Sequence, residues 1–384
     1  MTTISGTPSA SSSRLVALDV LRGITIAFMI MVNNNGDGAH AYWFMEHAKW
    51  NGFTPTDLVF PTFLFLVGTS IVFSTESRLS RGVSRTSIAL HTLRRAVILF
   101  LLGLVVNGFP FFHLATLRIY GVLQRIAFCF LFASLLYLWD RRASSKVVIV
   151  LVCLVGYWIL MRWVPVPGLG VPGRDVPLLD KDANLVAWLD RHIFPGRLYE
   201  GTRDPEGLLS NLPSMGTILL GMLTGIWLRT SRTLQQKFYG LFAAAVSLLI
   251  LGAIWNQWFP INKKLWTSSY VLFAAGWTVL ALAICYWLVE IRGWKRGWTA
   301  LWLVFGMNAI TAYVISELLA STLDSIAVPS GAHWHVALQP LIYRNVFAPV
   351  GNPAFASLLY SIAYMLVCAI PAWLLYRKKI FIKI

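Results

Sequence analysis

The sequence has little charge. Asp, Glu, Lys and Arg make up 12% of its 384 residues, about half of the ~25% that a soluble domain carries, whereas 57% of the residues are hydrophobic. This composition excludes a soluble globular enzyme, a disordered protein and a nucleic-acid-binding domain. The formal net charge of +16 does not indicate a nucleic-acid partner, because membrane proteins accumulate Lys and Arg in their cytoplasmic loops. A polytopic protein of the lipid bilayer is predicted.

Cysteine is also scarce. The four cysteines all lie inside apolar runs, so we expect neither a disulfide framework nor a metal site; they are Cys129, Cys153, Cys285 and Cys368.

Long apolar runs dominate the rest of the chain. A spanning helix needs about 20 mostly apolar residues, and the first such run is not a cleavable signal peptide because Asp19 and Arg22 interrupt it. We predict an all-α integral membrane protein with about ten transmembrane helices, at 15–34, 57–76, 91–108, 118–139, 146–163, 212–229, 237–255, 267–289, 299–320 and 355–376.

The loops between these runs alternate in charge. Basic residues concentrate in every second connection, for example at Arg78, Arg81 and Arg85 and at the C-terminal Arg377. By the positive-inside rule, both termini are expected in the cytoplasm.

The segments outside the apolar runs suggest a simple domain organisation. Residues 1–13 are polar and without periodicity, so a disordered tail is expected there. Residues 14–384 are expected to form a single transmembrane domain. Its outer loop 165–213, rich in Pro and Gly, is expected to have compact local structure. In the connection 321–354, the stretch WHVALQPLIYRNVF is too short to span and fits an interfacial or re-entrant helix.

Ionisable groups inside spans are costly and usually face a cavity or a partner. Asp19 and Arg22 share a helix face, which fits either a mutual ion pair or a polar cavity open to the cytoplasm. Arg125 lies about 10 Å from the outer end of its span and needs a carboxylate, for which Asp57 is a candidate, or a phosphate. Asn308 and Glu317 add polarity to the ninth span, although Glu317 is close enough to the outer end to be solvated.

The first outer loop carries the clearest candidate chemistry. Asn33 ends the first helix, His47 follows, and Thr54-Pro55-x-Asp57 is typical of a helix start with an acidic cap. Asp57 is therefore either a capping residue only or the carboxylate beside a general base, His47.

Further candidates for substrate contacts lie in three outer segments. Asn34, Trp50 and Asn51 belong to the first loop. In the run DPEGLLSNLPS, Asp204 and Glu206 are candidates to hold a cationic amine. In NKKLWTSSY, Lys263 and Trp266 are candidates to frame a sugar. Ordinary helix caps and interfacial anchors remain the alternative for each run.

Several runs together resemble one family. They are RLVALDVLRGITI, VN, YWFMEHAKWNGFTPTDLVFPTFLFLVG, RIYGVLQRIA, DPEGLLSNLPSMGTILLG, NKKLWTSSYVLFAAG and GMNAITAY, in this order over residues 14–313. They are similar to the transmembrane acyltransferases of the heparan-α-glucosaminide N-acetyltransferase family and its bacterial relatives. The resemblance implies a transmembrane acyltransferase fold and transfer of acetyl from cytosolic acetyl-CoA to a glucosamine amine across the membrane.

The resemblance also implies roles for particular residues. The family's catalytic histidine falls on His47 and its catalytic asparagine on Asn33, with Asn34 as the alternative because three asparagines are consecutive. Asp57 is then expected to fix the histidine tautomer, and the polar residues inside spans are expected to meet the cofactor: Asp19, Arg22, Arg125 and Asn308.

The resulting hypothesis is an acetyl-CoA-dependent N-acetyltransferase of a bacterial inner membrane, without a metal. A large lumenal domain precedes the first helix in the animal enzyme, and we do not expect one here, so a smaller amino sugar or a glycan end is the expected acceptor. Direct transfer and an acetyl-histidine intermediate both remain open, as does a homodimer. The alternatives are a sugar transporter and an O-acyltransferase of an envelope polysaccharide.

Overall fold

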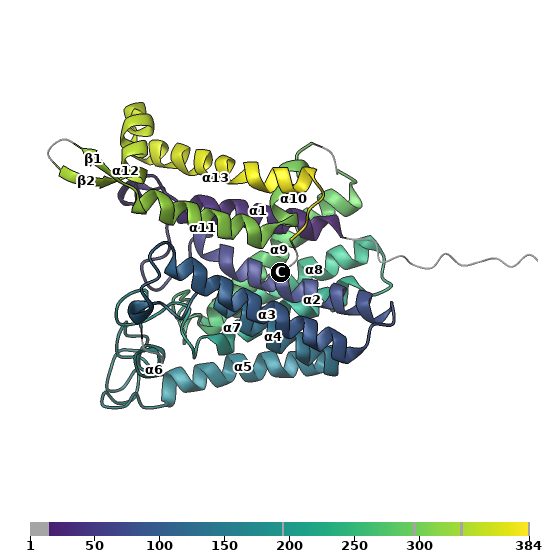
Figure 1. Cartoon of the computed structure of the whole chain (residues 1–384). Coiled ribbons are helices and arrows are strands. Elements are labelled where there is room, and N and C mark those ends of the chain that lie inside the picture. The colour runs from purple at the N-terminus through teal and green to yellow at the C-terminus, as the bar shows by residue number, and fades with distance from the viewer. Residues whose placement is uncertain (1–14, 194–195, 295–296, 331–332, 383–384) are drawn as a thin grey trace, which may run out of the picture.

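The computed structural model describes residues 15–193, 196–294, 297–330 and 333–382. At residues 329, 330 and 333–335 it describes the backbone but not the side chains. The predicted disordered tail lies outside the described residues. The protein is an all-α membrane protein whose long helices run side by side in one bundle (Figure 1).

Within the described ranges, nine helical segments are long and apolar enough to span a membrane. Their helices are α1 (Val16–Asn33), α2 (Val59–Leu79), α3 (Arg85–Gly108), α4 (Val122–Trp139), α5 (Ala143–Trp163), α7 (Asn211–Leu228), α8 (Leu234–Trp255), α9 (Ser268–Tyr286, continued by the π-helical turn η5, Trp287–Ile291) and α13 (Pro353–Arg377).

The tenth predicted span is broken. It consists of α10 (Thr299–Met307) and α11 (Ala309–Ser325), which meet at an angle of 82°. The break is at Asn308, whose backbone is not helical. Its side chain instead accepts from Ile382 N at 3.0 Å and donates to Ile380 O at 3.1 Å. The prediction of ten spans is confirmed if this bent pair is one span, but a continuous helix over 299–320 was wrong.

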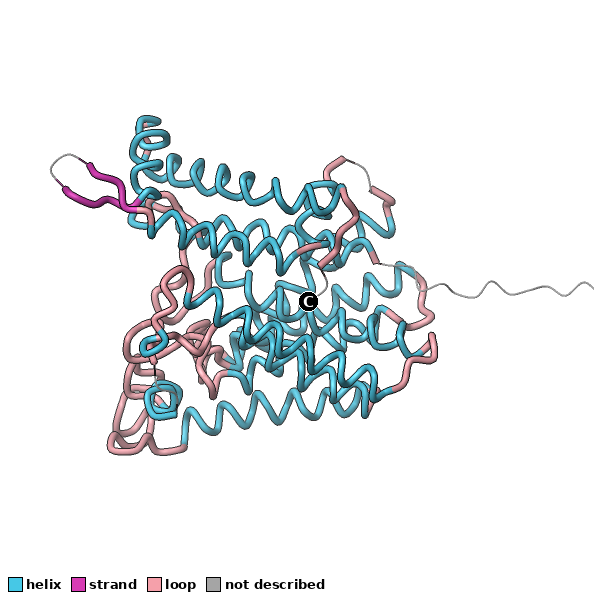
Figure 2. Tube along the Cα trace, in the orientation of Figure 1, coloured by secondary structure: helices cyan, strands magenta, loops and turns pink. Residues whose placement is uncertain are grey.

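The short elements and long loops gather at one end of the bundle (Figure 2). They include α6 (Leu185–Ile193) in the long loop 165–210 and the short helical turns η1 (Gly38–His40), η2 (Trp43–Met45), η3 (Pro55–Leu58) and η4 (Leu114–Thr116). In the last connection they are β1 (Ala327–Ser330), β2 (His333–Ala337), α12 (Leu338–Ile342), η6 (Tyr343–Phe347) and η7 (Ala348–Val350). The antiparallel β1–β2 hairpin was not predicted from the sequence.

Close backbone packing positions the helix that carries Arg22. A Cβ atom added at Gly23 of α1 would lie 1.7 Å from the Trp302 carbonyl oxygen, and one at Gly306 of α10 would lie 2.0 Å from the Asp19 carbonyl oxygen. Only glycine permits so close an approach between two helices. The pair therefore holds α1 against α10 at the level of Arg22.

Candidate active site

The site is organised around a histidine–carboxylate pair in the first loop. His47 Nδ1 lies 2.7 Å from Asp57 Oδ1. The other carboxylate oxygen, Asp57 Oδ2, accepts from Ala48 N at 3.2 Å, Thr54 N at 3.0 Å and the Thr54 hydroxyl at 3.1 Å. These donors stabilise an ionised carboxylate, so Nδ1 carries the proton and donates it to Asp57, which leaves a lone pair on Nε2.

Asp57 caps a helical turn and also contacts His47. It closes a capping box with Thr54 at the start of η3, and the same side chain holds His47. Its side chain is 1% exposed, whereas that of His47 is 42% exposed. The capping box thus fixes the buried Asp57 carboxylate, and this carboxylate orients the partly exposed His47 side chain.

His47 faces a pocket of about 440 Å³, which we call the histidine pocket. Its charged lining residues, among those described, include three basic and four acidic side chains: Arg118, Lys263, Lys264, Asp57, Glu200, Glu206 and Glu317. Burial lowers the pKa of His47 below its usual 6.5, the nearby Lys263 lowers it further, and the hydrogen bond to Asp57 opposes both. The neutral imidazole is the form that accepts a proton.

The three consecutive asparagines have different positions. Asn33 lines the histidine pocket and donates from Nδ2 to Glu317 Oε1 at 3.2 Å. Asn34 donates to the Ile30 carbonyl of its own helix at 2.8 Å. Asn35 donates to backbone carbonyls of Val32 and Met45. Asn33 is thus the asparagine that shares a pocket with His47.

The two acids expected to hold an amine are joined by an arginine that the sequence analysis did not single out. Arg118 contacts Asp204 through Nε at 2.8 Å and Nη2 at 2.6 Å, and Glu206 through Nη2 at 2.6 Å. These carboxylates raise the pKa of Arg118 despite its burial. Asp204 is buried and saturated by these contacts and by backbone N–H groups. Of the two acids, Glu206 lines the pocket.

Three other expected substrate residues support the loops. Trp50 donates from Nε1 to the Leu179 carbonyl at 2.9 Å, and Asn51 Oδ1 accepts from Asn262 at 3.1 Å. Trp266 is 1% exposed and donates to the Thr217 hydroxyl at 3.1 Å. None of the three is among the described residues that line the histidine pocket.

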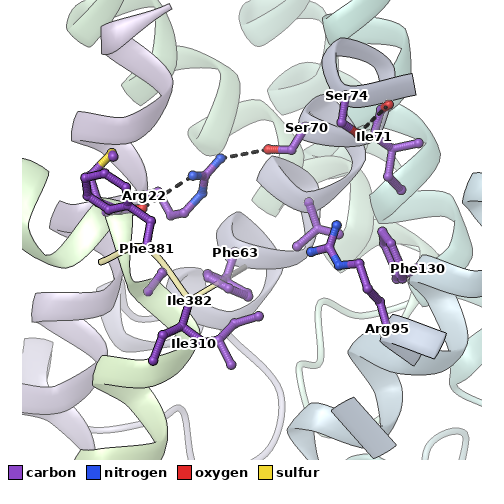
Figure 3. Close-up of a pocket in the computed structure, with 14 residues that line it drawn as sticks. Arg22, Phe63, Ser70, Ile71, Ser74, Arg95, Phe130, Ile310, Phe381 and Ile382 are labelled. Carbon is purple, nitrogen blue, oxygen red and sulfur yellow. Dashed lines mark hydrogen bonds between the residues drawn. The ribbon is translucent and has the colours of Figure 1, made fainter. Parts of the chain in front are cut away.

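A second pocket, of about 390 Å³, is lined by two arginines, and we call it the arginine pocket (Figure 3). Arg22 donates to Ser70 Oγ at 2.7 Å and lies 3.0 Å from Asp19 Oδ1. Arg95 lies over the Phe130 ring, 4.8 Å from its centroid. Arg22 is thus paired with Asp19 and also lines a cavity, whereas the opening of this cavity to the cytoplasm stays a prediction.

Arg125 and Asn308, which were also expected to contact the cofactor, line neither the histidine pocket nor the arginine pocket. Arg125 is 1% exposed, donates to Ser210 Oγ and the Gly207 carbonyl, and lies over the Trp266 ring. It therefore secures the long loop at this point and is not hydrogen-bonded to Asp57. Asn308 holds Ile380–Ile382, and this segment contributes Phe381 and Ile382 to the wall of the arginine pocket.

The two pockets lie along the same faces of three helices. On α1, Arg22 lines the arginine pocket and Met29 the histidine pocket. The same spacing of seven residues separates Val67 from Phe60 on α2 and Ile310 from Glu317 on α11. Seven residues are nearly two full turns, so each pair shares a face and lies about 10 Å apart.

The sequence analysis missed Arg118 and gave Glu317 no role. Glu317 carried a signal, since an acid within an apolar run usually faces a functional cavity. Arg118 carried a weaker one, a basic residue at the first position of a predicted span.

Fold and site together define a multi-pass integral membrane protein with a histidine–carboxylate pair in a pocket at one end of its helical bundle. Within the described residues, no group of three or more His, Cys, Asp and Glu side chains is arranged to hold a metal ion. The family model of the catalytic region of heparan-alpha-glucosaminide N-acetyltransferase matches residues 14–255, and the chain belongs to this family.

Two curated proteins named heparan-alpha-glucosaminide N-acetyltransferase are similar to the chain. The mouse protein is 28% identical over 430 aligned positions, which cover 98% of this chain and 62% of the mouse protein. The human protein is 31% identical over 261 positions, which cover 56% of this chain and 39% of the human protein. The chain therefore spans less than two thirds of the length of either relative.

Proposed function

We propose that this protein is a membrane acetyltransferase that moves acetyl from cytosolic acetyl-CoA to the amine of a glucosamine-type sugar on the other side of the membrane. The observation that carries the proposal is the His47–Asp57 pair, whose Nε2 faces a pocket aligned with the arginine pocket along α1, α2 and α11. The name of the mouse and human relatives supports the reaction class.

In this mechanism His47 is the general base. The acceptor amine attacks the thioester carbonyl, and Nε2 takes the amine proton as the N–C bond forms. The C–S bond then breaks, and the CoA thiolate leaves and takes that proton from the imidazolium. Asp57 holds the Nδ1–H tautomer throughout. An acetyl-histidine intermediate uses the same two side chains.

Asn33 is the proposed oxyanion donor. One N–H of its amide is directed at Glu317, so the nitrogen, not the oxygen, faces this side of the pocket. The second N–H of that nitrogen is then available to the oxygen of the tetrahedral intermediate. Glu206 and Glu317 place carboxyl groups in the same pocket, where they are the proposed contacts of the amino sugar, which attacks as the neutral amine.

The arginine pocket is the proposed site of the anionic part of CoA. Guanidinium groups bind phosphates through paired N–H donors, and both Arg22 and Arg95 line this space. Matching lining residues of the two pockets lie about 10 Å apart along the helices, and the two linings come within three residues of each other at Phe60 and Phe63 of α2. The acyl end extends across this distance.

The experiment is an assay of purified protein with labelled acetyl-CoA and glucosamine. N-acetylglucosamine is the expected product. A transporter yields no acetylated sugar, and an O-acyltransferase yields an ester that mild base cleaves. Either result overturns the proposal, and an acceptor series in the same assay identifies the preferred sugar.

Sidedness has its own test in cells of a bacterial host, since we propose the inner membrane with both termini in the cytoplasm. The four native cysteines are buried, so their background labelling is low. Lys181→Cys in the long loop should react with a membrane-impermeant thiol reagent, and Ser87→Cys at the other end should not; both positions are exposed. The reverse pattern reverses the proposed direction of transfer.

A further inference from the structure

Lys263 lies where an acceptor amine has to lie. Its Nζ is 3.0 Å from His47 Nε2 and 3.1 Å from Nδ1. Because Nδ1–H is committed to Asp57, the Lys263 N–H donates to Nε2, the atom that accepts the proton in the proposed reaction. A primary amine of the protein itself is thus hydrogen-bonded to the general base.

The loop before α9 holds Lys263 in this position. Asn262 is buried, and its Oδ1 accepts from Leu265 N at 2.9 Å while its Nδ2 donates to Asn51 at 3.1 Å. Trp266 N donates to the Lys263 carbonyl at 3.0 Å and closes the turn. The stem of Lys263 therefore starts from a fixed turn that is tied to the same loop as His47.

The neighbouring Lys264 has a different environment. Its Nζ lies 2.7 Å from Glu200 Oε1, an ion pair that keeps the amine protonated. No described carboxylate forms such an ion pair with Lys263, and burial lowers the pKa of Lys263. Only the neutral form of an amine has the lone pair that attacks a carbonyl. With its pKa lowered and without the ion pair that holds Lys264, the charged Lys263 releases its proton more readily and is the more nucleophilic of the two.

We propose that Lys263 is a self-acetylation site, modified by acetyl-CoA when no acceptor occupies the histidine pocket. This inference rests on the proposed function, since it uses the same donor and base. Lys263 first loses its ammonium proton to water, and the Nζ lone pair then attacks the thioester carbonyl, the Nζ–C bond forms and the C–S bond breaks. His47 Nε2 takes the Nζ proton and returns it to the CoA thiolate, so the products are Nε-acetyl-lysine and free CoA.

The modification inactivates the enzyme. An acetylated Lys263 has no positive charge and adds an acetyl group to a pocket of about 440 Å³ beside Nε2. A bound acceptor displaces Lys263 from His47 and therefore protects it. The protein thus loses activity over time in acetyl-CoA alone, at a rate that falls as the acceptor concentration rises.

The test incubates the full-length protein in detergent with labelled acetyl-CoA, with and without saturating glucosamine, and locates the label by peptide mass spectrometry. We expect one acetyl group per chain on Lys263, with one equivalent of CoA released. Unlike an acetyl-histidine, this label resists hydroxylamine and is not transferred to glucosamine added later. Lys263→Arg should lose the label, Lys264→Arg should keep it, and His47→Ala should slow labelling at least ~10²-fold.

The inference is overturned if Lys263 is labelled no faster than Lys264, if the label is hydroxylamine-labile, or if His47→Ala labels as fast as the native protein. Formation of N-acetylglucosamine in the same preparation separates the two proposals. If N-acetylglucosamine forms in the arm with glucosamine but Lys263 stays unlabelled in acetyl-CoA alone, this inference alone is overturned. The absence of both products overturns the proposed function as well.

Discussion

The histidine pocket and the arginine pocket differ in how charge is arranged. In the first, basic and acidic side chains both line the pocket with His47, and several are joined as Arg118–Glu206 and Lys264–Glu200. In the second, the charged lining residues among those described are Arg22 and Arg95. A balanced set of proton donors and acceptors suits acid–base chemistry, whereas two arginines suit an anion. The difference supports the proposal that the reaction takes place in the histidine pocket and that the arginine pocket anchors the cofactor.

The largest expected effect is on turnover, from a change in the histidine pocket. His47→Ala removes the proposed base and should lower kcat by roughly 10²–10⁴-fold. Acetyl-CoA binding, measured by calorimetry, should stay close to that of the native protein because the arginine pocket is about 10 Å away. A variant with near-native turnover removes His47 from the mechanism, and one that no longer binds acetyl-CoA contradicts the separation of the pockets.

Asn33→Ala should lower kcat by roughly 10²–10³-fold, because it removes the proposed oxyanion donor. The matched control is Asn34→Ala, whose amide donates to the Ile30 carbonyl. This control should cost far less in kcat in the same steady-state assay. If Asn34→Ala is the more damaging change, Asn34 rather than Asn33 is the oxyanion donor.

Contacts between residues close in the sequence were more predictable than contacts between distant ones. The Asp19–Arg22 and His47–Asp57 contacts were each among the alternatives considered, because these partners are close in the chain and helix or cap geometry brings them together. Asn33–Glu317 was not, because these residues are 284 positions apart and meet only when α11 packs beside α1. The break at Asn308 was missed for a similar reason. Its side chain binds a backbone segment that is distant in the sequence, and the hydropathy of residues 299–320 contains no information about that contact.

Sequence analysis also overestimated how many polar outer residues face the site. Trp50, Asn51 and Trp266 hold loops together, and Asp204 is saturated by Arg118 and backbone donors. Composition and spacing identify residue types capable of recognition. Whether such a residue faces a pocket depends on how the loops pack. Loops, unlike helices and strands, have no regular repeat from which the direction of a side chain could be predicted.

A smaller effect, on binding, is expected from the arginine pocket. Arg22→Met keeps a long stem but removes the charge, so the KM for acetyl-CoA should rise several-fold while the KM for the acceptor changes little. Arg85→Met, at an exposed position where α3 begins, is the matched control and should leave both constants in place. If Arg22 serves only Asp19, both constants hold and the folded yield falls, because an unpaired carboxylate remains buried.

The smallest expected effect is a shift in the pH profile, and it tests the charge balance around His47 directly. The base must be neutral to accept a proton, and the pKa of His47 is lowered from 6.5. As the pH falls, kcat/KM should therefore decrease only below pH 6.5, where His47 becomes protonated, and it should be at its full value above this pH. This decrease is the acidic limb of the profile. Lys263 contributes to this lowering, so Lys263→Met should raise the pKa of His47 and move the limb to higher pH, whatever its effect on the plateau. Lys264→Met removes a charge already paired with Glu200 and should leave the limb in place. A limb that stays fixed in Lys263→Met, measured over pH 5 to 8 with a substrate whose own ionisation is corrected for, would show that Lys263 does not tune the base.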